Sequence, residues 1–255
     1  MIRILVIGNN FGGLTASLEL KRQLGGEVHV TVIGRNSDFV YTPSLIWVPF
    51  GRRKTKDITF DVGDTLAKHN VFFMVDEATR VDAENHRVIT ARKRILYYDF
   101  LIIASGAELA WDAVPGLGPH AFSHSIFTPQ DAHDASDAWH RFEENPGPVV
   151  IGAVPGASCM GAGYEYLFNF AHQARKSKIR NRFQMTWITP EPFLGHFGIG
   201  GIRGGKTLIK NFLRMQGIDY RDNTAITEVL PGGVKLASGE IIESRWTMLV
   251  PPFRA

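Results

Sequence analysis

Apolar residues in the first part of the chain follow the pattern of a strand, a helix and a second strand. Residues 2–8, IRILVIG, form a continuous apolar run, which is typical of a parallel strand buried on both faces. Residues 14–24 then carry apolar positions at helical spacing and stop at Gly25-Gly26, a common end of a helix. Residues 28–34, VHVTVIG, again read as a strand. Because a glycine turn links the first strand to the helix, this order predicts a βαβ unit.

A second unit of the same kind begins near residue 148. PVVIGAVPGASCMGAGYEYLFNFAHQARK predicts a strand, a glycine-rich turn and a helix, and FQMTWIT predicts the strand that follows. QDAHDASDAWHRFEEN, which precedes this unit, predicts a helix closed by PGP.

Further strands are expected between and after the two units. VFFMV and RVDAENHRVIT read as a strand and a hairpin arm, and RILYYDFLIIASG reads as one buried strand ending in a small-residue turn. Residues 218–250 alternate strands with the turns PGG and SGE. These elements predict an α/β protein with two Rossmann-like, three-layer units, β-meander and hairpin insertions, and an incomplete first unit. We expect a dinucleotide-binding domain at 1–108, a second Rossmann-like domain at 109–245, and a truncated return into the first domain at 246–255.

Composition narrows the function classes. The 28 Lys and Arg residues are dispersed and the formal net charge is only +3, which does not indicate nucleic-acid binding. Cys159 is the single cysteine, so the chain can form no internal disulfide and is compatible with a reducing compartment. No signal peptide is apparent and no apolar run approaches the ~20 residues that span a bilayer. The chain reads as cytoplasmic or peripheral to a membrane, and no metal site is predicted.

The first glycine turn, VIGNNFGG, resembles the G-x-G-x-x-G pattern that holds a pyrophosphate at a helix N-terminus. Gly8 and Gly13 occupy the outer positions, and Asn10 replaces the middle glycine. Asparagine adopts a left-handed backbone more readily than other non-glycine residues, so we expect Asn10 to be tolerated there, with an amide able to donate to a phosphate. A purely structural turn without a ligand is the alternative.

The residue that usually selects the nucleotide is an acid at the end of the second strand. Here that position carries Arg35 and Asn36, and no acid is present. Arg35 could serve the 2′-phosphate of NADP, or it could pair with the diphosphate or adenine of FAD. This position alone leaves both cofactors open.

The second glycine turn departs further from the phosphate-binding pattern. Val154 and Pro155 fall where a pyridine nucleotide would need bare backbone, and proline has no N–H to donate. Cys159 follows at or near the start of the next helix, where the positive end of the helix dipole favours a thiolate. A small cysteine buried in the core is the alternative.

With these residues in view, the chain resembles the sulfide:quinone oxidoreductases, flavoproteins of the disulfide-reductase superfamily with two dinucleotide-type domains. The resemblance covers essentially the whole chain and rests on GNNFGGL, YTPSLIWVPFG, YYDFLIIASG, VVIGAVPGASCMGAGYEY, TPEPFLGHFGIGG and MLVPPFR. The fourth stretch, together with EPFLGHFG, is the most specific.

The resemblance implies that FAD binds the first unit, whereas the second keeps a nucleotide-binding fold without using NAD(P)H. It assigns cofactor-binding roles to eleven residues. These are Gly8, Asn10, Gly12 and Gly13 at the diphosphate, Arg35 and Asn36 at the adenosine, Ala78 at the adenine, Pro43 and Ser44 near the isoalloxazine, and Ser105 and Gly106 along the cofactor.

The resemblance also implies a reaction, the oxidation of sulfide with electrons passed through FAD to a quinone. Cys159 matches the redox cysteine that takes sulfur as a persulfide or thiol and attacks the flavin C4a, and Glu165 and His196 match nearby groups proposed to handle protons. A surface carboxylate and a loop histidine are the plain alternatives for these two. An NAD(P)H-dependent flavin oxidoreductase and a non-catalytic remnant are the alternative functions.

The chain departs from the family pattern in three places. Phe127 stands where relatives carry a cysteine, and Asp131 stands where a histidine is expected. The chain ends at Ala255, whereas relatives continue for well over a hundred residues with the partner cysteine, the quinone pocket and membrane-docking helices. We therefore expect a truncated family member, a fragment or a proteolysed chain, peripheral on the cytoplasmic membrane in its full-length form. Its open sheet edge favours either association into a homo-oligomer or instability, and the sequence does not choose between them.

Overall fold

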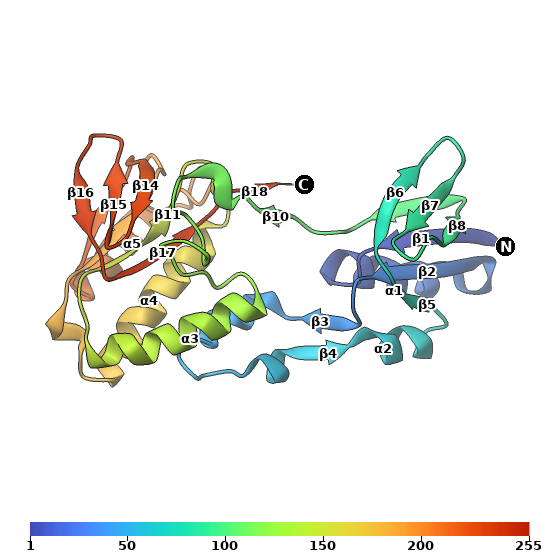
Figure 1. Cartoon of the computed structure of the whole chain (residues 1–255), viewed down its shortest axis with the longest axis horizontal. Helices are drawn as coiled ribbons and strands as arrows, with labels where there is room; N and C mark the ends of the chain where they lie inside the picture. Colours follow the sequence, from blue (N-terminus) through green and yellow to red (C-terminus); the bar gives the residue numbers. More distant parts are fainter. Residues whose placement is uncertain (255) are drawn as a thin grey trace. The chain divides into compact units, whose positions relative to one another are not determined.

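The computed structural model describes residues 1–254, which divide into two compact units (Figure 1). Unit 1 contains Met1–Tyr41 and Ile58–Ala107, and unit 2 contains Thr42–Asp57 and the residues from Glu108 onward. Each unit has one parallel four-stranded sheet and small antiparallel additions, so the predicted α/β fold with two Rossmann-like units is confirmed.

The parallel sheet of unit 1 has the strand order β5-β2-β1-β9. It consists of β1 (Ile2–Ile7), β2 (Val28–Gly34), β5 (Phe72–Val75) and β9 (Phe100–Ile103), with α1 (Phe11–Leu24), η1 (Gly25–Glu27) and α2 (Val62–Lys68) in the connections. Val30 and Val32 pack with Leu66 of α2 on one face, whereas Leu5 and Ile33 pack with Val88 on the other. Burial on both faces explains why β1 and β2 read as continuous apolar runs.

The second face of this sheet is covered by an antiparallel meander of β6 (Ala78–Asp82), β7 (Arg87–Thr90) and β8 (Ile95–Tyr97). A short hairpin pairs β3 (Asp38–Val40) with β4 (Thr59–Asp61). The single buried strand predicted for RILYYDFLIIASG is wrong, because β8 and β9 belong to different sheets. Asp99 lies between them and accepts hydrogen bonds from the backbone and side chain of Arg3, and Phe100 and Ile103 of β9 are exposed.

The parallel sheet of unit 2 has the equivalent order β13-β12-β11-β17. It consists of β11 (Val149–Ala153), β12 (Met185–Ile188), β13 (Ile218–Arg221) and β17 (Trp246–Val250), and its helices are α3 (Pro129–Glu144), α4 (Met160–Lys176) and α5 (Gly205–Met215). Trp139 of α3 and Phe170 of α4 pack on one face with Trp246. The predicted helix before the second unit is confirmed as α3, but α5 was not predicted.

A second meander, β14 (Ile226–Leu230), β15 (Gly233–Leu236) and β16 (Ile241–Glu243), covers the other face of this sheet. The predicted turns PGG and SGE join its strands. Unit 2 also contains the antiparallel strand pair of β10 (Glu108–Leu109) and β18 (Phe253–Arg254). Its short 3-10 helices are η2 (Thr42–Trp47), η3 (Thr55–Ile58), η4 (Trp111–Ala113) and η5 (Arg180–Arg182). The last residue of η3, Ile58, belongs to unit 1.

The two units differ from the predicted domains in two places, although the change after Ala107 agrees with the boundary predicted at 108. Thr42–Asp57 groups with unit 2 because Phe50 packs against Trp139 and Tyr166, with ring centroids 5.2 and 5.5 Å away. The fully buried strand β17 pairs with β11 along its whole length, so it completes the sheet of unit 2 and does not return to unit 1. None of the helices within residues 1–254 is both long and apolar enough to cross a membrane.

Candidate functional site

The first glycine turn brings β1, α1 and the loop after β9 into close contact. Gly8 has a φ of 107°, and a Cβ added to it would lie 2.1 Å from the carbonyl oxygen of Ala104. A Cβ on Gly13 would lie 1.7 Å from the carbonyl oxygen of Gly8. Because both positions exclude any side chain, the N-terminus of α1 is held against the carboxyl edge of the sheet.

Asn10 does not adopt the predicted left-handed backbone. Its φ of −95° and ψ of −155° are extended, and it is the N-cap of α1. Its side-chain Oδ1 accepts a hydrogen bond from the N–H of Phe11 at 2.9 Å, and its carbonyl oxygen accepts one from Leu14 at 2.8 Å. The helix therefore begins at Phe11, earlier than the predicted start at residue 14, and a capping side chain explains why asparagine fits here.

Asn9, which the sequence analysis did not single out, connects the first turn to the segment after β2. Its Nδ2 donates to the carbonyl oxygens of Asn36 at 2.9 Å and Asp38 at 3.4 Å. A Cβ on Gly34 would lie 2.3 Å from Asn9 Oδ1, so the glycine at the end of β2 makes room for this side chain. The polar residue beside Gly8 and the glycine ending β2 are the two sequence signals for this contact.

The other predicted cofactor residues of unit 1 also follow the carboxyl ends of its parallel strands. Arg35 and Asn36 come directly after β2, and Ser105 and Gly106 come after β9. The N–H of Asp76 donates to the carbonyl oxygen at the end of β2, which places the stretch leading to Ala78 at the same edge. Pro43 and Ser44 lie in η2, which belongs to unit 2, so the structure does not group them with the other nine.

Asp76 is a buried carboxyl at this edge that the sequence analysis missed. Burial raises the pKa of its carboxyl, but hydrogen bonds from Thr90 Oγ1 at 2.8 Å and the N–H of Glu77 at 2.9 Å outweigh burial and hold the pKa below its usual value. Asp76 therefore stays ionised and ties β7 to the end of β5.

The first turn fits a bound diphosphate. Among residues 1–254, no acceptor is present for the backbone N–H groups of Gly12 and Gly13, which lie in the first turn of α1. The same turn of α1 contains no acidic residue that would compete for these donors. Free N–H groups at the positive end of a helix dipole form an anion site suited to the pyrophosphate of a dinucleotide.

The second glycine turn retains the close packing of the first but lacks free donors at two of its positions. A Cβ on Gly152 would lie 2.0 Å from the carbonyl oxygen of Ile188. Val154 is fully buried, so its side chain enters the core and does not fill the turn as predicted. Its N–H donates to the carbonyl oxygen of Val250 at 3.2 Å, and the exposed Pro155 has no N–H. Two N–H donors of a phosphate-binding loop are therefore missing. The N–H of Val154 is already bonded, and Pro155 has none.

Cys159 occupies the N-cap position of α4 and is exposed. The alternative of a cysteine buried in the core is therefore wrong. Its side chain makes no capping hydrogen bond, and the first turn of α4 contains no acidic residue. The thiol stands free at the positive end of the α4 dipole.

A buried carboxylate holds the loop after β12 against α4. Glu191 is 4% exposed, and its Oε2 accepts hydrogen bonds from Tyr164 Oη at 2.8 Å and Thr189 Oγ1 at 2.9 Å. Its Oε1 accepts one from the N–H of Phe197 at 2.7 Å, and the N–H of Gly195 donates to Tyr164 Oη at 3.1 Å. Burial and the Glu191 carboxylate raise the pKa of Tyr164, which keeps the phenol protonated as a donor.

His196 lies in this loop between the two backbone groups held by Tyr164 and Glu191. Its Nδ1 accepts a hydrogen bond from the N–H of Gly198 at 3.2 Å, and its ring packs against Phe193. Glu165 follows Tyr164 on α4 and is exposed, although partial burial raises the pKa of its carboxyl. Among residues 1–254 no hydrogen bond joins Cys159, Glu165 and His196 directly; Tyr164 links their two segments.

The two positions that depart from the family pattern have structural contacts. Phe127 packs edge-on against Phe253, with ring centroids 5.6 Å apart. Asp131 lies in the first turn of α3 and accepts a hydrogen bond from Ser125 Oγ at 2.6 Å. Both residues therefore help to fix the chain before and within α3.

Comparisons with known proteins agree with this arrangement. The family model of the pyridine nucleotide-disulphide oxidoreductases matches residues 2–178. The sulfide-quinone reductase of Aquifex aeolicus is 33% identical over 255 residues, which cover 98% of this chain and 58% of that protein. The mitochondrial sulfide:quinone oxidoreductase of Dictyostelium discoideum is 26% identical over 187 residues, or 72% of this chain and 41% of that protein.

Solved structures show the same relationship. The X-ray structure of the Aquifex aeolicus sulfide:quinone oxidoreductase matches with a TM-score of 0.94 at 33% identity, covering 99% of this chain and 59% of that one. The NDH2 structure from Plasmodium falciparum, in complex with NADH, shares the fold with a TM-score of 0.77 at 18% identity, over 99% of this chain and 55% of that one. The chain thus spans less than two thirds of the length of these relatives. It belongs to the pyridine nucleotide-disulphide oxidoreductase family, and within that family it is a relative of the sulfide:quinone oxidoreductases.

Proposed function

We propose that this protein is an FAD-dependent oxidoreductase of the sulfide:quinone reductase type. Unit 1 binds FAD, Cys159 of unit 2 takes the sulfur of sulfide, and a quinone is the final electron acceptor. The observation that carries this proposal is the exposed Cys159 at the N-cap of α4, in a turn where Val154 and Pro155 offer no phosphate donor. A thiol stands where a pyridine nucleotide would otherwise bind.

The chemistry at Cys159 balances as a two-electron oxidation. The thiolate of Cys159 and a hydrosulfide ion form one S–S bond as the S–H bond of the hydrosulfide breaks. The products are a persulfide anion on Cys159, one proton and two electrons. FAD, when bound, would supply the two-electron acceptor for this oxidation, and a quinone would be the final electron acceptor. The free N–H groups of Gly12 and Gly13 would hold its diphosphate, and Arg35 and Asn36 would lie beside its adenosine.

Glu165 and His196 are proposed to handle the released proton. The raised pKa of Glu165 brings its carboxyl closer to the range in which it can accept a proton at neutral pH. The half-buried ring of His196 is oriented by the N–H of Gly198, and the loop around it is fixed by Tyr164. Because quinones dissolve in lipid, we propose that the protein works at the cytoplasmic face of a membrane.

The alternative is an NAD(P)H-dependent flavin oxidoreductase. Arg35 favours it, because this exposed cation forms no ion pair within residues 1–254 and could face a 2′-phosphate. The engaged N–H of Val154 and the missing N–H of Pro155 oppose it, because the second unit then lacks a cradle for the nicotinamide nucleotide.

The test begins with the absorbance spectrum of the purified chain after incubation with FAD and gel filtration. Retained flavin supports FAD binding, whereas a colourless protein contradicts it. Sulfide is then added without oxygen to wild-type protein and to Cys159→Ser. The proposal expects bleaching of the bound flavin in the wild type and slow or absent bleaching in the variant. Equal bleaching in both would remove Cys159 from the reaction, and rapid bleaching by NADPH alone would favour the alternative.

A further inference from the structure

The parallel sheet of unit 2 has one covered edge and one open edge. The covered edge is β17, where the N–H of His124 donates to the carbonyl oxygen of Thr247 at 2.7 Å and His124 pairs with Met248. The open edge is β13, whose single neighbour in the sheet is β12. Within residues 1–254, no segment pairs with the other side of β13. This edge is therefore free to take a further strand.

The hydrogen-bond alternation of β13 shows which of its backbone groups face the open edge. The carbonyl oxygen of Arg221 accepts a hydrogen bond at 2.9 Å from the N–H of Thr189, the residue after β12. In a parallel ladder, residues that bond to one neighbour alternate with residues that face away from it, so Asp219 also bonds to β12. Ile218 and Tyr220 then direct their N–H and carbonyl groups outward. Among the residues that the structure describes, these groups have no partner.

Helix α5 lies beside β13 and presents a row of cations to this edge. Lys206, Lys210 and Arg214 are spaced four residues apart, so they share one side of the helix. Phe212 is on a different side, where it packs against Phe168 of α4 with ring centroids 5.9 Å apart. The cations of α5 are therefore turned away from α4.

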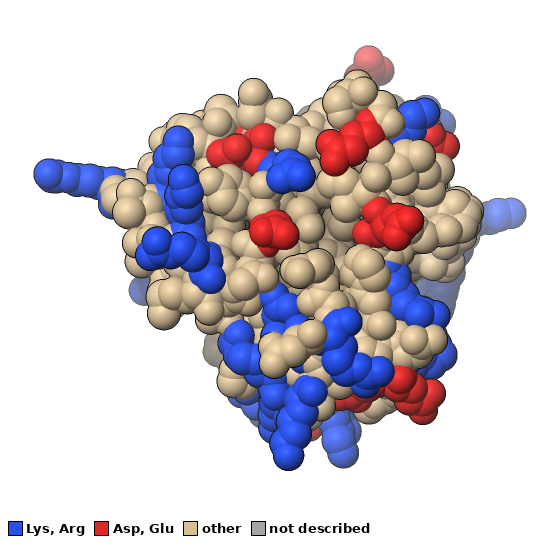
Figure 2. All heavy atoms as spheres, turned by 90° about the vertical axis from the view of Figure 1, so that its left-hand side faces the viewer, with Lys and Arg blue, Asp and Glu red and all other residues tan. Residues whose placement is uncertain are grey.

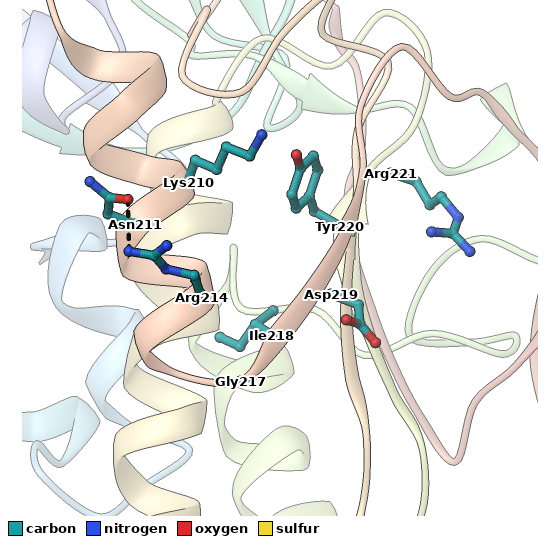
Figure 3. Close-up of a pocket in the computed structure, with 8 residues that line it drawn as sticks. All are labelled: Lys210, Asn211, Arg214, Gly217, Ile218, Asp219, Tyr220 and Arg221. Atoms are coloured by element: carbon teal, nitrogen blue, oxygen red, sulfur yellow. Dashed lines mark hydrogen bonds between the residues drawn. The ribbon is translucent and has the colours of Figure 1, made fainter.

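A cleft of ≈ 570 Å³ separates α5 from the open edge of β13 (Figure 3). Lys210, Asn211 and Arg214 line it from the helix, and residues 217–221 line it from the strand and the turn before it. Lys210 extends towards the ring of Tyr220, with its Nζ 5.9 Å from the ring centroid. The cleft thus has cations on one wall and the backbone of an unpaired strand on the other.

The cleft carries positive charge that nothing nearby compensates. Its lining contains three cations and one carboxylate, that of Asp219. No ion pair within residues 1–254 involves Lys210, Arg214 or Asp219. Figure 2 looks onto the part of unit 2 that contains α5 and β14–β16, and Lys and Arg gather over its lower part and one side. This charge favours a negatively charged partner.

We propose that the cleft binds an acidic segment of a partner protein, which joins the sheet of unit 2 as a fifth strand beside β13. The backbone of the segment bonds to the outward groups of Ile218 and Tyr220, and its carboxylates face Lys210 and Arg214. Strand addition at a sheet edge gains affinity from main-chain hydrogen bonds and specificity from alternate side chains. This docking uses neither Cys159 nor a flavin, so it goes beyond the proposed redox function and does not rest on it.

The spacing of the two cations specifies the pattern of acids in the partner. Lys210 and Arg214 are four residues apart, which is a rise of about 6 Å along the helix. Every second side chain of a strand points to the same face, at a spacing of about 6.6 Å. Two acidic residues with one residue between them therefore match the two cations. Adjacent acidic residues would point to opposite faces of the sheet.

Other occupants of this edge fit less well. Two copies of the chain that paired through β13 would bring Lys210 and Arg214 of each copy close to the same cations of the other. Charged side chains beside an open strand normally prevent such pairing between copies. A small phosphate compound would use the cations but not the row of backbone groups on β13. An acidic strand uses both.

The test is the binding of fluorescently labelled peptides to the full chain, measured by fluorescence anisotropy. The acidic probe alternates Val and Glu, the basic probe has Lys in place of Glu, and a third probe places the same Glu residues next to one another. The double variant Lys210→Gln, Arg214→Gln removes the two cations of the cleft. Its matched control, Lys54→Gln, Lys56→Gln, removes two exposed cations outside the cleft. Circular dichroism verifies that both variants are folded.

The wild type should bind the alternating acidic peptide more tightly than the other two peptides, and salt should weaken this binding. The cleft variant should lose roughly tenfold in affinity, because two exposed ion pairs with the peptide are removed. The control variant should stay within about twofold of the wild type, because its cations do not meet the peptide.

Two further measurements distinguish strand addition from attraction between charges alone. Amide hydrogen exchange followed by NMR should slow at Ile218 and Tyr220 when the peptide binds, but not at Asp219 and Arg221, which already bond to β12. N-methylation of every Glu, or of every Val, removes the N–H groups along one edge of the peptide. One of these two modifications should abolish binding and the other should spare it, because only one edge of the peptide pairs with β13.

Several results would overturn the proposal. They are wild-type protein that does not bind the acidic peptide, equal binding of the acidic and basic peptides, equal losses in the two double variants, or N-methylation that acts alike on both edges. Binding of inorganic pyrophosphate without binding of the peptide would assign the cleft to a phosphate compound. A dimer in sedimentation velocity that the cleft variant alters, without peptide binding, would assign the edge to a second copy of the chain.

Discussion

The hydroxyl of Tyr164 donates a 2.8 Å hydrogen bond to the buried carboxylate of Glu191, and it accepts one from the N–H of Gly195. This one oxygen therefore joins α4, just after the Cys159 turn, to the loop that carries His196. The two segments are more than thirty residues apart in the sequence, and no local pattern relates them.

Tyr164→Phe is expected to destabilise the protein by about 1–3 kcal/mol, because it leaves a buried carboxylate with one donor fewer and the N–H of Gly195 without its acceptor. Urea unfolding followed by fluorescence measures the loss. Tyr220→Phe is the matched control, since no hydrogen bond to the Tyr220 hydroxyl is present among residues 1–254. Limited proteolysis should show faster cleavage near His196 in Tyr164→Phe only. A variant as stable as the wild type would show that Tyr164 does not hold the loop.

Gly13→Ala should abolish flavin retention and cost about 2–4 kcal/mol of stability, because the new Cβ would meet the carbonyl oxygen of Gly8 at 1.7 Å. Gly26→Ala provides the control, since a Cβ there meets nothing within 4 Å. Thermal unfolding and FAD titration are measured on both variants. If Gly13→Ala bound FAD as the wild type does, the close approach of α1 to β1 could not be required for the site.

Substitutions of Asn10 show whether this residue acts as a helix N-cap or as a turn residue with a left-handed backbone. As an N-cap, Asn10→Ala should cost about 1 kcal/mol and Asn10→Gly only a few tenths. A left-handed backbone would give a different ranking, with glycine more stable than asparagine. Chemical denaturation of the three proteins decides between these outcomes, and a stabilising glycine would contradict the extended conformation of Asn10.

His124 should make the stability of unit 2 depend on pH. Burial against Trp246, and secondarily the charge of Arg141, lower the pKa of His124 from 6.5 to about 4. Between these pH values His124 is protonated in the unfolded state but not in the folded state. Its contribution to the free energy of unfolding is therefore fully present above pH 6.5 and is lost as the pH drops towards 4. The full loss corresponds to about 3 kcal/mol.

The measurement is urea unfolding at a series of pH values for wild type and His124→Gln, which should flatten the dependence between pH 6.5 and 4. His29→Gln replaces an exposed histidine and should leave the slope as in the wild type. An unchanged slope in His124→Gln would mean that other groups cause the acid sensitivity.

Most of the fold could be predicted because its signals are local. The apolar runs of β1, β2, β11 and β12 and the glycine turns after β1 and β11 identified both parallel sheets. Helix α5 was missed because exposed Leu208, Phe212 and Met215 obscure its inward face, where Gly205 and Leu213 are buried and Ile209 is partly buried. The break between β8 and β9 was missed because it depends on Asp99 meeting Arg3, a residue far away in the sequence.

The candidate site was predictable only in part, for a similar reason. The position of Cys159 before a helix follows from the glycine turn, and the structure bears it out. The roles of Asn9, Asp76 and Glu191 depend on partners between fourteen and twenty-nine residues away or on loop geometry, which spacing alone does not encode. The prediction for Val154 was wrong for a different reason. Its place in a ligand-binding pattern suggested that its side chain fills the turn, but the side chain points into the core.

The central claim is that Cys159 receives the sulfur of sulfide, and mass spectrometry of the protein tests it most directly. FAD-loaded protein is mixed with sulfide without oxygen, trapped with an alkylating agent and digested. We expect the peptide that contains Cys159 to gain the mass of one sulfur atom, in step with the loss of flavin absorbance. Flavin that is reduced by sulfide while the Cys159 peptide stays unmodified would contradict the account.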